Sequence, residues 1–193
     1  MASSPQVDSS AHSLELLDAQ VRECYGRVIC AYVAHDRCSE ILLCRLENVR
    51  LLQIILSSMT TAGCVGVTFA KSSSAGVVGV VLSFVLLALN AYAKSHDLGV
   101  VAQRHRQAAA DLWLLREKCL SLITDLSIGG ESVADLKTRR DELLDELHKV
   151  FARAPAIASA ARGRTWDALR KGGEVSFSDA ELDLLLPYAL RRG

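Results

Sequence analysis

Residues 51–70 read LLQIILSSMTTAGCVGVTFA and residues 72–93 read SSSAGVVGVVLSFVLLALNAYA, and neither stretch contains a charged residue. At a rise of about 1.5 Å per residue, a helix of roughly 20 residues reaches about 30 Å, which is the thickness of a bilayer's hydrocarbon core. Two apolar runs of this length favour membrane spans over the buried hairpin of a soluble protein. The sequence therefore predicts an integral membrane protein with transmembrane helices at 51–70 and 75–93.

The link between the two spans is only Lys71 to Ser74, so the helices must be antiparallel neighbours. Basic residues flank the other ends of both spans, at Arg45, Arg50, Lys94, Arg104 and Arg106. Because cytoplasmic loops carry the excess of Lys and Arg, we expect both termini in the cytoplasm. The predicted location is the cell inner membrane, with lipid around the hairpin.

Small residues recur every four positions in both spans, which lets helix backbones approach closely in lipid. They are Ser58, Ala62, Gly66 and Ala70 in the first span, and Ala75, Gly79 and Ser83 in the second. Polar side chains accompany them at Gln53, Thr60, Thr61, Thr68 and Asn90. Two interpretations stay open, namely packing within one hairpin and assembly of several hairpins around a water-filled path. The candidate packing or pore-lining residues are Ser58, Ala62, Gly66, Gly79, Ser83 and Asn90.

Apolar or small residues outside the spans follow the alternating three-and-four spacing of a heptad. This spacing runs from Leu14 to Leu42, from Leu98 to Leu126 and from Val133 to Val150. Gly129 and Gly130 predict a helix end, and Ser132 predicts the next N-cap. No stretch has a convincing strand pattern. The predicted fold class is all-α, with a membrane hairpin and a cytoplasmic helical bundle of coiled-coil periodicity, which suits a homo-oligomer.

The predicted domain organisation is one domain at 13–193, after a disordered N-terminus at 1–12. Its parts are an N-terminal helix at 13–50, the two spans, and the cytoplasmic bundle at 95–193. Within the bundle, Pro155 is expected to open a helix through Trp166 and Leu169. Ser178 is expected to cap a last short helix that contains Leu182, Leu185 and Leu186.

Composition and motifs argue against an enzyme or a nucleic-acid binder. Lys and Arg number 22, as do Asp and Glu, so the net charge is zero and direct nucleic-acid binding is not expected. The six cysteines form no CxxC pair, and the five histidines form no HExxH. No Walker loop, GxSxG or GxGxxG is present. We therefore predict no catalytic residue, metal ion or cofactor.

Residues 105–125 read HRQAAADLWLLREKCLSLITD, a His and small residues before Leu-Trp-x-Leu-Arg and then a Leu-rich stretch ending in Asp. With a later Arg and an Ala-Pro after a helix, this stretch resembles the SLATT family, two-transmembrane effectors associated with SMODS nucleotidyltransferases and SLOG sensors. The positions that match are His105, Leu112, Trp113, Arg116, Glu117, Asp125, Arg140 and Pro155. The resemblance extends from about residue 15 to the end, and residues 177–192 resemble the tail of one branch.

The resemblance implies a pore-forming or membrane-disrupting effector of a bacterial antiphage conflict system, without catalytic residues. It implies a trigger from a separately encoded sensor or signal-producing enzyme, such as a nucleotidyltransferase or a reverse transcriptase. The alternative from another class is a membrane-anchored scaffold that forms no pore. Such a scaffold would recruit a cytoplasmic partner through its heptad helices.

Overall fold

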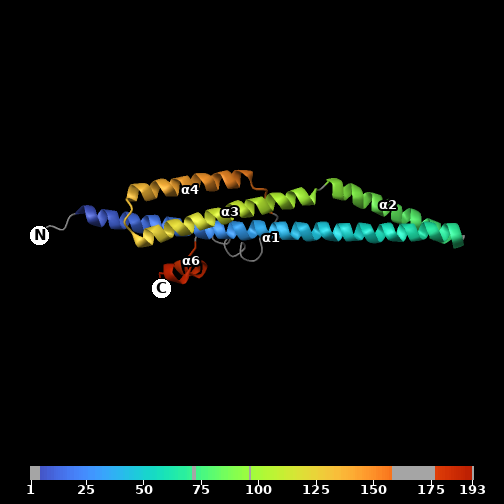
Figure 1. The fold of residues 1–193 in the computed structure, drawn as a ribbon, viewed down its shortest axis with the longest axis horizontal. Helices are drawn as coiled ribbons and strands as arrows, with labels where there is room; N and C mark the ends of the chain where they lie inside the picture. The colour runs from blue at the N-terminus through green and yellow to red at the C-terminus, as the bar shows by residue number, and fades with distance from the viewer. Residues whose placement is uncertain (1–4, 71–72, 96, 158–176, 193) are drawn as a thin grey trace. The chain divides into compact units, whose positions relative to one another are not determined.

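The computed structural model describes residues 5–70, 73–95, 97–157 and 177–192, and it is all-α across these ranges (Figure 1). The elements are α1 (Pro5–Ala70), α2 (Ser73–Ser95), α3 (Leu98–Ile128), α4 (Val133–Arg153), α6 (Asp179–Leu185) and a 3-10 turn (Tyr188–Leu190). The predicted fold class is confirmed. The expected helix through Trp166 and Leu169 lies outside the described residues.

The chain divides into two compact units. Unit 1 comprises residues 1–38 and 104–193, and unit 2 comprises residues 39–103. Helix α1 contributes to both units and joins the predicted N-terminal helix to the first span without a break. It also includes residues 5–12, where the sequence predicted a disordered N-terminus.

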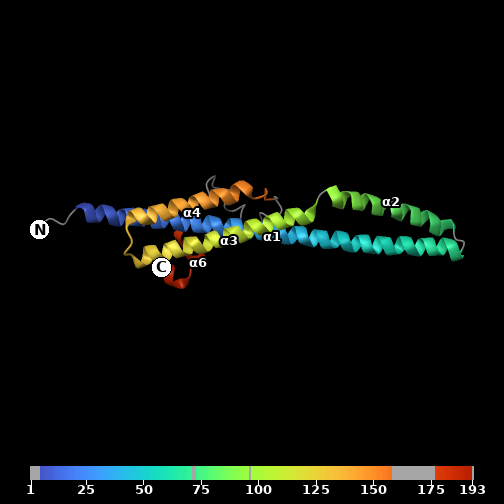
Figure 2. The ribbon, with the colours of Figure 1, turned by 45° about the horizontal axis from the view of Figure 1, so that its top comes forward.

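Helix ends lie where the capping residues predict them. Gly129 and Gly130 have φ values of 73° and 102°, a left-handed conformation that favours glycine, and they end α3. The Ser132 side chain accepts a hydrogen bond from the Asp135 backbone amide at 3.2 Å, which caps α4. Ser178 and Glu181 form a complete capping box at α6. The two glycines and the Ser132 cap fix the turn that brings α4 back along α3 (Figure 2).

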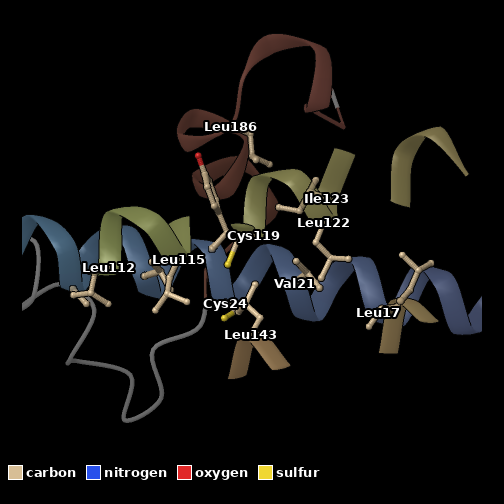
Figure 3. Packing of buried hydrophobic residues seen from close by; sticks show 14 residues of the cluster. Leu17, Val21, Cys24, Leu112, Leu115, Cys119, Leu122, Ile123, Leu143 and Leu186 are labelled. Atoms are coloured by element: carbon tan, nitrogen blue, oxygen red, sulfur yellow. The ribbon is translucent and has the colours of Figure 1, made fainter. Parts of the chain in front are cut away.

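The core of unit 1 consists mainly of heptad residues of α1, α3 and α4, and Leu186 of the C-terminal segment packs against them (Figure 3). Its most deeply buried members are Leu17, Val21, Tyr25, Val28, Leu112, Leu115, Cys119, Leu122, Ile123 and Leu136. Full burial of a Leu or Val side chain stabilises by about 1.5–3 kcal/mol before entropy is counted, so this seam is the main stabilising feature. The heptad seam is closed by three helices of the same chain.

The C-terminal segment, residues 177–192, packs on α1 in unit 1 at Gly26. A Cβ added to Gly26 would lie 2.9 Å from Leu182 and 3.0 Å from Phe177, closer than side chains tolerate. Next to this glycine, the Tyr25 hydroxyl donates a hydrogen bond to the Leu185 carbonyl at 3.1 Å. The helix thus presents a flat site on which α6 can lie.

Charged residues of α1 tie down the end of this C-terminal segment. The Arg22 guanidinium donates to Asp18 at 2.8 Å and to the Leu190 carbonyl at 2.9 Å. Arg192 donates to the same Asp18 oxygen, and its backbone amide donates to Asp183 at 3.2 Å. Because Arg22 is 5% exposed, its own charge-assisted bonds are screened little by water.

We predict that Gly26→Leu releases the C-terminal segment, because a leucine there cannot fit beneath Leu182 and Phe177. Overpacking of this kind costs about 1–3 kcal/mol of unfolding free energy. The full-length variant should melt earlier, and its C-terminal arginines should be cut faster by trypsin. Ala19→Leu, at an exposed position of α1, is the control. Equal trypsin rates for the two variants would contradict the packing role of Gly26.

Candidate functional site

The hairpin of unit 2 carries an apolar surface that is exposed among the residues that the structure describes. Two helices are long and apolar enough to cross a membrane, and the most apolar 18-residue windows within them are 0% and 6% buried. The core helix of a soluble protein would be mostly buried. Exposed side chains include Leu51, Ile54, Met59, Val77, Val81, Phe84 and Leu87. This surface matches the needs of a lipid-facing hairpin.

Helices α1 and α2 contact each other through one polar and several apolar positions. The Gln53 side-chain amide donates a hydrogen bond to Oδ1 of the Asn90 side chain at 2.7 Å. Leu56 is buried on the same face of α1. Further along, a Cβ on Gly76 would lie 3.2 Å from Val67, so glycine allows a close approach there. The amide pair fixes how the two spans face each other.

Five hydroxyl groups within the spans form hydrogen bonds with the backbone of their own helices. Each donates to the carbonyl four residues earlier, at 2.8–3.0 Å; the donors are Ser58, Thr60, Thr61, Thr68 and Ser83. Such bonds remove the cost of placing a hydroxyl in hydrocarbon. These groups therefore need neither water nor a partner helix.

The candidate packing or pore-lining residues occupy different faces of the hairpin. Ser58, Ala62 and Ser83 are exposed, Gly66 is half-buried and Gly79 is buried. Asn90 is exposed but bonded to Gln53. The structure does not gather these six residues into one site. Ser58 and Ala62 lie on a different face of α1 from Gln53 and Leu56.

In unit 1, His105 of α3 lies against His35 of α1. Their Nδ1 atoms are 2.9 Å apart, and both side chains are at most 3% exposed. One Nδ1 must donate and the other must accept, so the pair fits two neutral rings of different tautomers. Burial, together with the neighbouring His105 ring, lowers the pKa of His35 to about 4. Burial also lowers the pKa of His105.

The next four motif residues divide between core and surface. Leu112 is fully buried in the seam, whereas Trp113 is 49% exposed. The Arg116 guanidinium lies 3.4 Å from the Glu117 carboxylate on the partly exposed surface of α3. Only the leucine of this group is a core residue, and the tryptophan presents an aromatic surface to the surroundings.

Of the remaining motif residues, Asp125 stabilises the turn between α3 and α4, whereas Arg140 and Pro155 lie elsewhere in the bundle. Asp125 accepts a hydrogen bond from Arg139 at 2.7 Å, and Arg139 also bonds Glu131. These carboxylates raise the pKa of Arg139. Arg140 instead donates to Gln20 of α1 at 2.9 Å. Pro155 is half-buried just after α4.

The cysteines and charged grooves of unit 1 show no catalytic arrangement. The Cys24 and Cys119 thiols lie close together in the core (Figure 3). A hydrogen bond with Cys24 raises the pKa of the Cys119 thiol, and burial raises it further. A groove of about 210 Å³ between α3 and α4 contains Lys118 and Glu146, whose side chains bond each other at 2.6 Å. Within the described ranges, no three His, Cys, Asp or Glu side chains gather where a metal could bind.

The family model for the SMODS and SLOG-associating 2TM effector domain family 4 matches residues 17–181. The chain belongs to the SLATT family. No curated protein and no solved structure matches the chain. SLATT membership implies a membrane effector role in defence systems, and the family's name implies association with SMODS or SLOG partner proteins. Together with the unburied spans, it supports membrane localisation. SLATT is not a known enzyme family.

The sequence motif did not reveal the C-terminal packing site. Arg22, Tyr25 and Gly26 make its contacts, yet none matches the motif that we used to identify SLATT. The SLATT match ends at residue 181, so Leu186 and the arginines after it lie beyond it. A glycine in the middle of a heptad helix was the available signal.

We predict that the SLATT bundle loses stability as pH falls from about 6.5 to about 4. In this range the histidines of the unfolded chain become protonated, whereas the buried His pair of the folded chain stays neutral. Stability is full above the unfolded pKa and is lost as pH falls toward the folded pKa. Thermal melts from pH 7.5 to pH 5 should therefore show a shallower slope for His35→Gln than for the original chain. His148→Gln, at an exposed position on α4, should keep the original slope. Identical slopes for all three proteins would refute the assignment.

Proposed function

We propose that this SLATT protein is an effector of a bacterial antiphage system that oligomerises and permeabilises the inner membrane when triggered. The observation that carries the proposal is the apolar hairpin that the protein leaves unburied, in a family of two-transmembrane effectors. Both termini lie in the cytoplasm in this proposal, since basic residues flank the outer ends of the spans. The protein itself catalyses no reaction.

The outer face of α1 supports assembly of several hairpins. Ser58 and Ala62 are small and exposed, and the Ser58 hydroxyl is already bonded to the Ile54 carbonyl. Pairing with α2 uses a different face, at Gln53 and Leu56. The face formed by Ser58 and Ala62, called the small face here, can therefore pack closely against a second hairpin without leaving a polar group unbonded. Packing between helices in lipid favours this arrangement. In such an assembly Gly66 would extend this contact, whereas Gly79, Ser83 and Asn90 share the face of α2 that packs on α1 within the hairpin, since Asn90 is bonded to Gln53.

The bundle of unit 1 is the part that a trigger would act on. Its heptad seams are already filled by the chain's own side chains, so a trigger has to favour one state of the bundle over another. In the proposal, a SMODS-type nucleotidyltransferase, its nucleotide product or a reverse transcriptase supplies that difference. His105, Leu112, Arg116, Glu117, Asp125, Arg140 and Pro155 hold the bundle, and none acts on a substrate.

A second candidate function is a membrane-anchored scaffold without a pore. The observation that favours it is the surface of α3, where Trp113 and Leu114 are 49% and 52% exposed. The buried seams leave little heptad surface for a partner, so recruitment would use these two side chains. A scaffold needs its spans only as an anchor, whereas a pore needs their sequence.

We predict that Ala62→Leu slows depolarisation, because a large side chain separates hairpins that pack through the small face. The measurement is a membrane-potential dye in bacteria that express the chain with its neighbouring genes after phage challenge. Ala88→Leu, at an exposed position of α2 outside the small-residue stripes, is the matched control. Equal depolarisation by both variants would contradict assembly through this face.

A hairpin exchange separates the pore from the scaffold. Replacing residues 51–93 with an unrelated apolar hairpin should abolish both depolarisation and protection against phage if the spans form the pore. Unchanged protection with the foreign hairpin would instead establish the scaffold.

A further inference from the structure

An open groove of about 510 Å³ lies between α1 and α2 within unit 2. Its lining residues are Arg50, Gln53, Ile54, Ser57, Leu86 and Asn90. Arg50, Gln53, Ile54 and Ser57 follow one another at helical spacing, so they line one strip of α1. From Arg50 to Ser57 this strip descends about 10 Å at 1.5 Å per residue. The groove is therefore elongated along the helix rather than across it.

Charge is concentrated at one end of the groove. Arg50 is the last charged residue before the uncharged run, so it lies where the hairpin leaves the hydrocarbon. Among the described residues, no ion pair with Arg50 is found. On α2, the face that carries Leu86 and Asn90 continues after four more residues to Lys94. Two cations thus flank the mouth.

The other end of the groove is mainly apolar, with Ser57 as its polar lining residue. Ile54 and Leu86 form its walls below the Gln53–Asn90 pair. Gln53 uses one amide hydrogen on the Asn90 oxygen, which leaves the Asn90 amide nitrogen with its own hydrogens to donate. From mouth to base, the groove offers a guanidinium, an amide donor, and then the hydrocarbon of Ile54 and Leu86 together with the Ser57 hydroxyl.

We propose that this groove binds one anionic phospholipid, with its phosphate on Arg50 and the Asn90 amide and an acyl chain along Ile54 and Leu86. The order of groups in the groove is the order of groups in the lipid, and basic pockets between membrane helices are known sites for such headgroups. A zwitterionic lipid satisfies Arg50 less well, because its own cation opposes the two at the mouth. The site requires the hairpin to lie in a membrane, but it does not require a pore.

The test is native mass spectrometry of the full-length protein in detergent, titrated with phosphatidylglycerol or phosphatidylcholine. The original chain should retain one phosphatidylglycerol in preference to phosphatidylcholine. Arg50→Gln should bind phosphatidylglycerol about fivefold more weakly, the effect of one basic residue at a membrane surface. Arg45→Gln removes the same charge from an exposed position of α1 outside the groove, and it should bind as the original does. Leu86→Trp keeps the charges but fills the groove, so it should also weaken binding.

Three results would overturn the proposal. Equal weakening by Arg50→Gln and Arg45→Gln would show attraction by overall charge. Unaltered binding to Leu86→Trp would place the lipid elsewhere. Displacement of the lipid by millimolar inorganic phosphate would show a phosphate site that does not recognise the acyl chain. Depolarisation is not measured in any of these arms, so their outcome is independent of the proposed effector function.

Discussion

The apolar surface of residues 51–93 has to be removed from water, and it stays exposed in the part of the chain that the structure describes. Helical structure satisfies the backbone, and back-bonded hydroxyls together with the Gln53–Asn90 pair satisfy the polar side chains. A bilayer is the remaining partner for the exposed leucines, valines and phenylalanine. This constraint explains why charge is absent from two runs and dense elsewhere, and why Arg50 and Lys94 stand where each run ends.

The bundle of unit 1 solves the same problem in a different way. Its apolar residues face one another across α1, α3 and α4. The buried His35 and His105 rings bond each other through their Nδ1 atoms, so these two nitrogens need no water within that seam. The C-terminal segment then covers α1 at Gly26 through Leu182 and Phe177. Because this unit fills its own seams, a trigger can act only by binding one conformation better than another. In the part of α3 that belongs to unit 1, the large apolar side chains that remain exposed for such binding are Trp113, Leu114 and Ile128.

Much of the fold could be predicted from local patterns. The heptads predicted the buried positions from Leu17 to Leu143, and Gly129, Ser132 and Ser178 predicted helix ends that the structure confirms. Long-range contacts could not be predicted in this way. A glycine at position 26 does not reveal that residues 177–192 will lie on it. The small stripe likewise left the rotation of α1 open, and the Gln53–Asn90 bond determines which face meets α2. The Asp125–Arg139 bond and the Arg140–Gln20 bond likewise could not be predicted from local patterns.

The most direct test of this account is a topology measurement on the full chain in bacteria. A reporter that is active only outside the cytoplasm is inserted after residue 72 or fused after residue 193. A membrane hairpin with both ends in the cytoplasm predicts activity at residue 72 and none at residue 193. Activity at residue 193, or at neither position, would contradict the account, because the hairpin would then be inverted, or the chain would cross the membrane once or not at all.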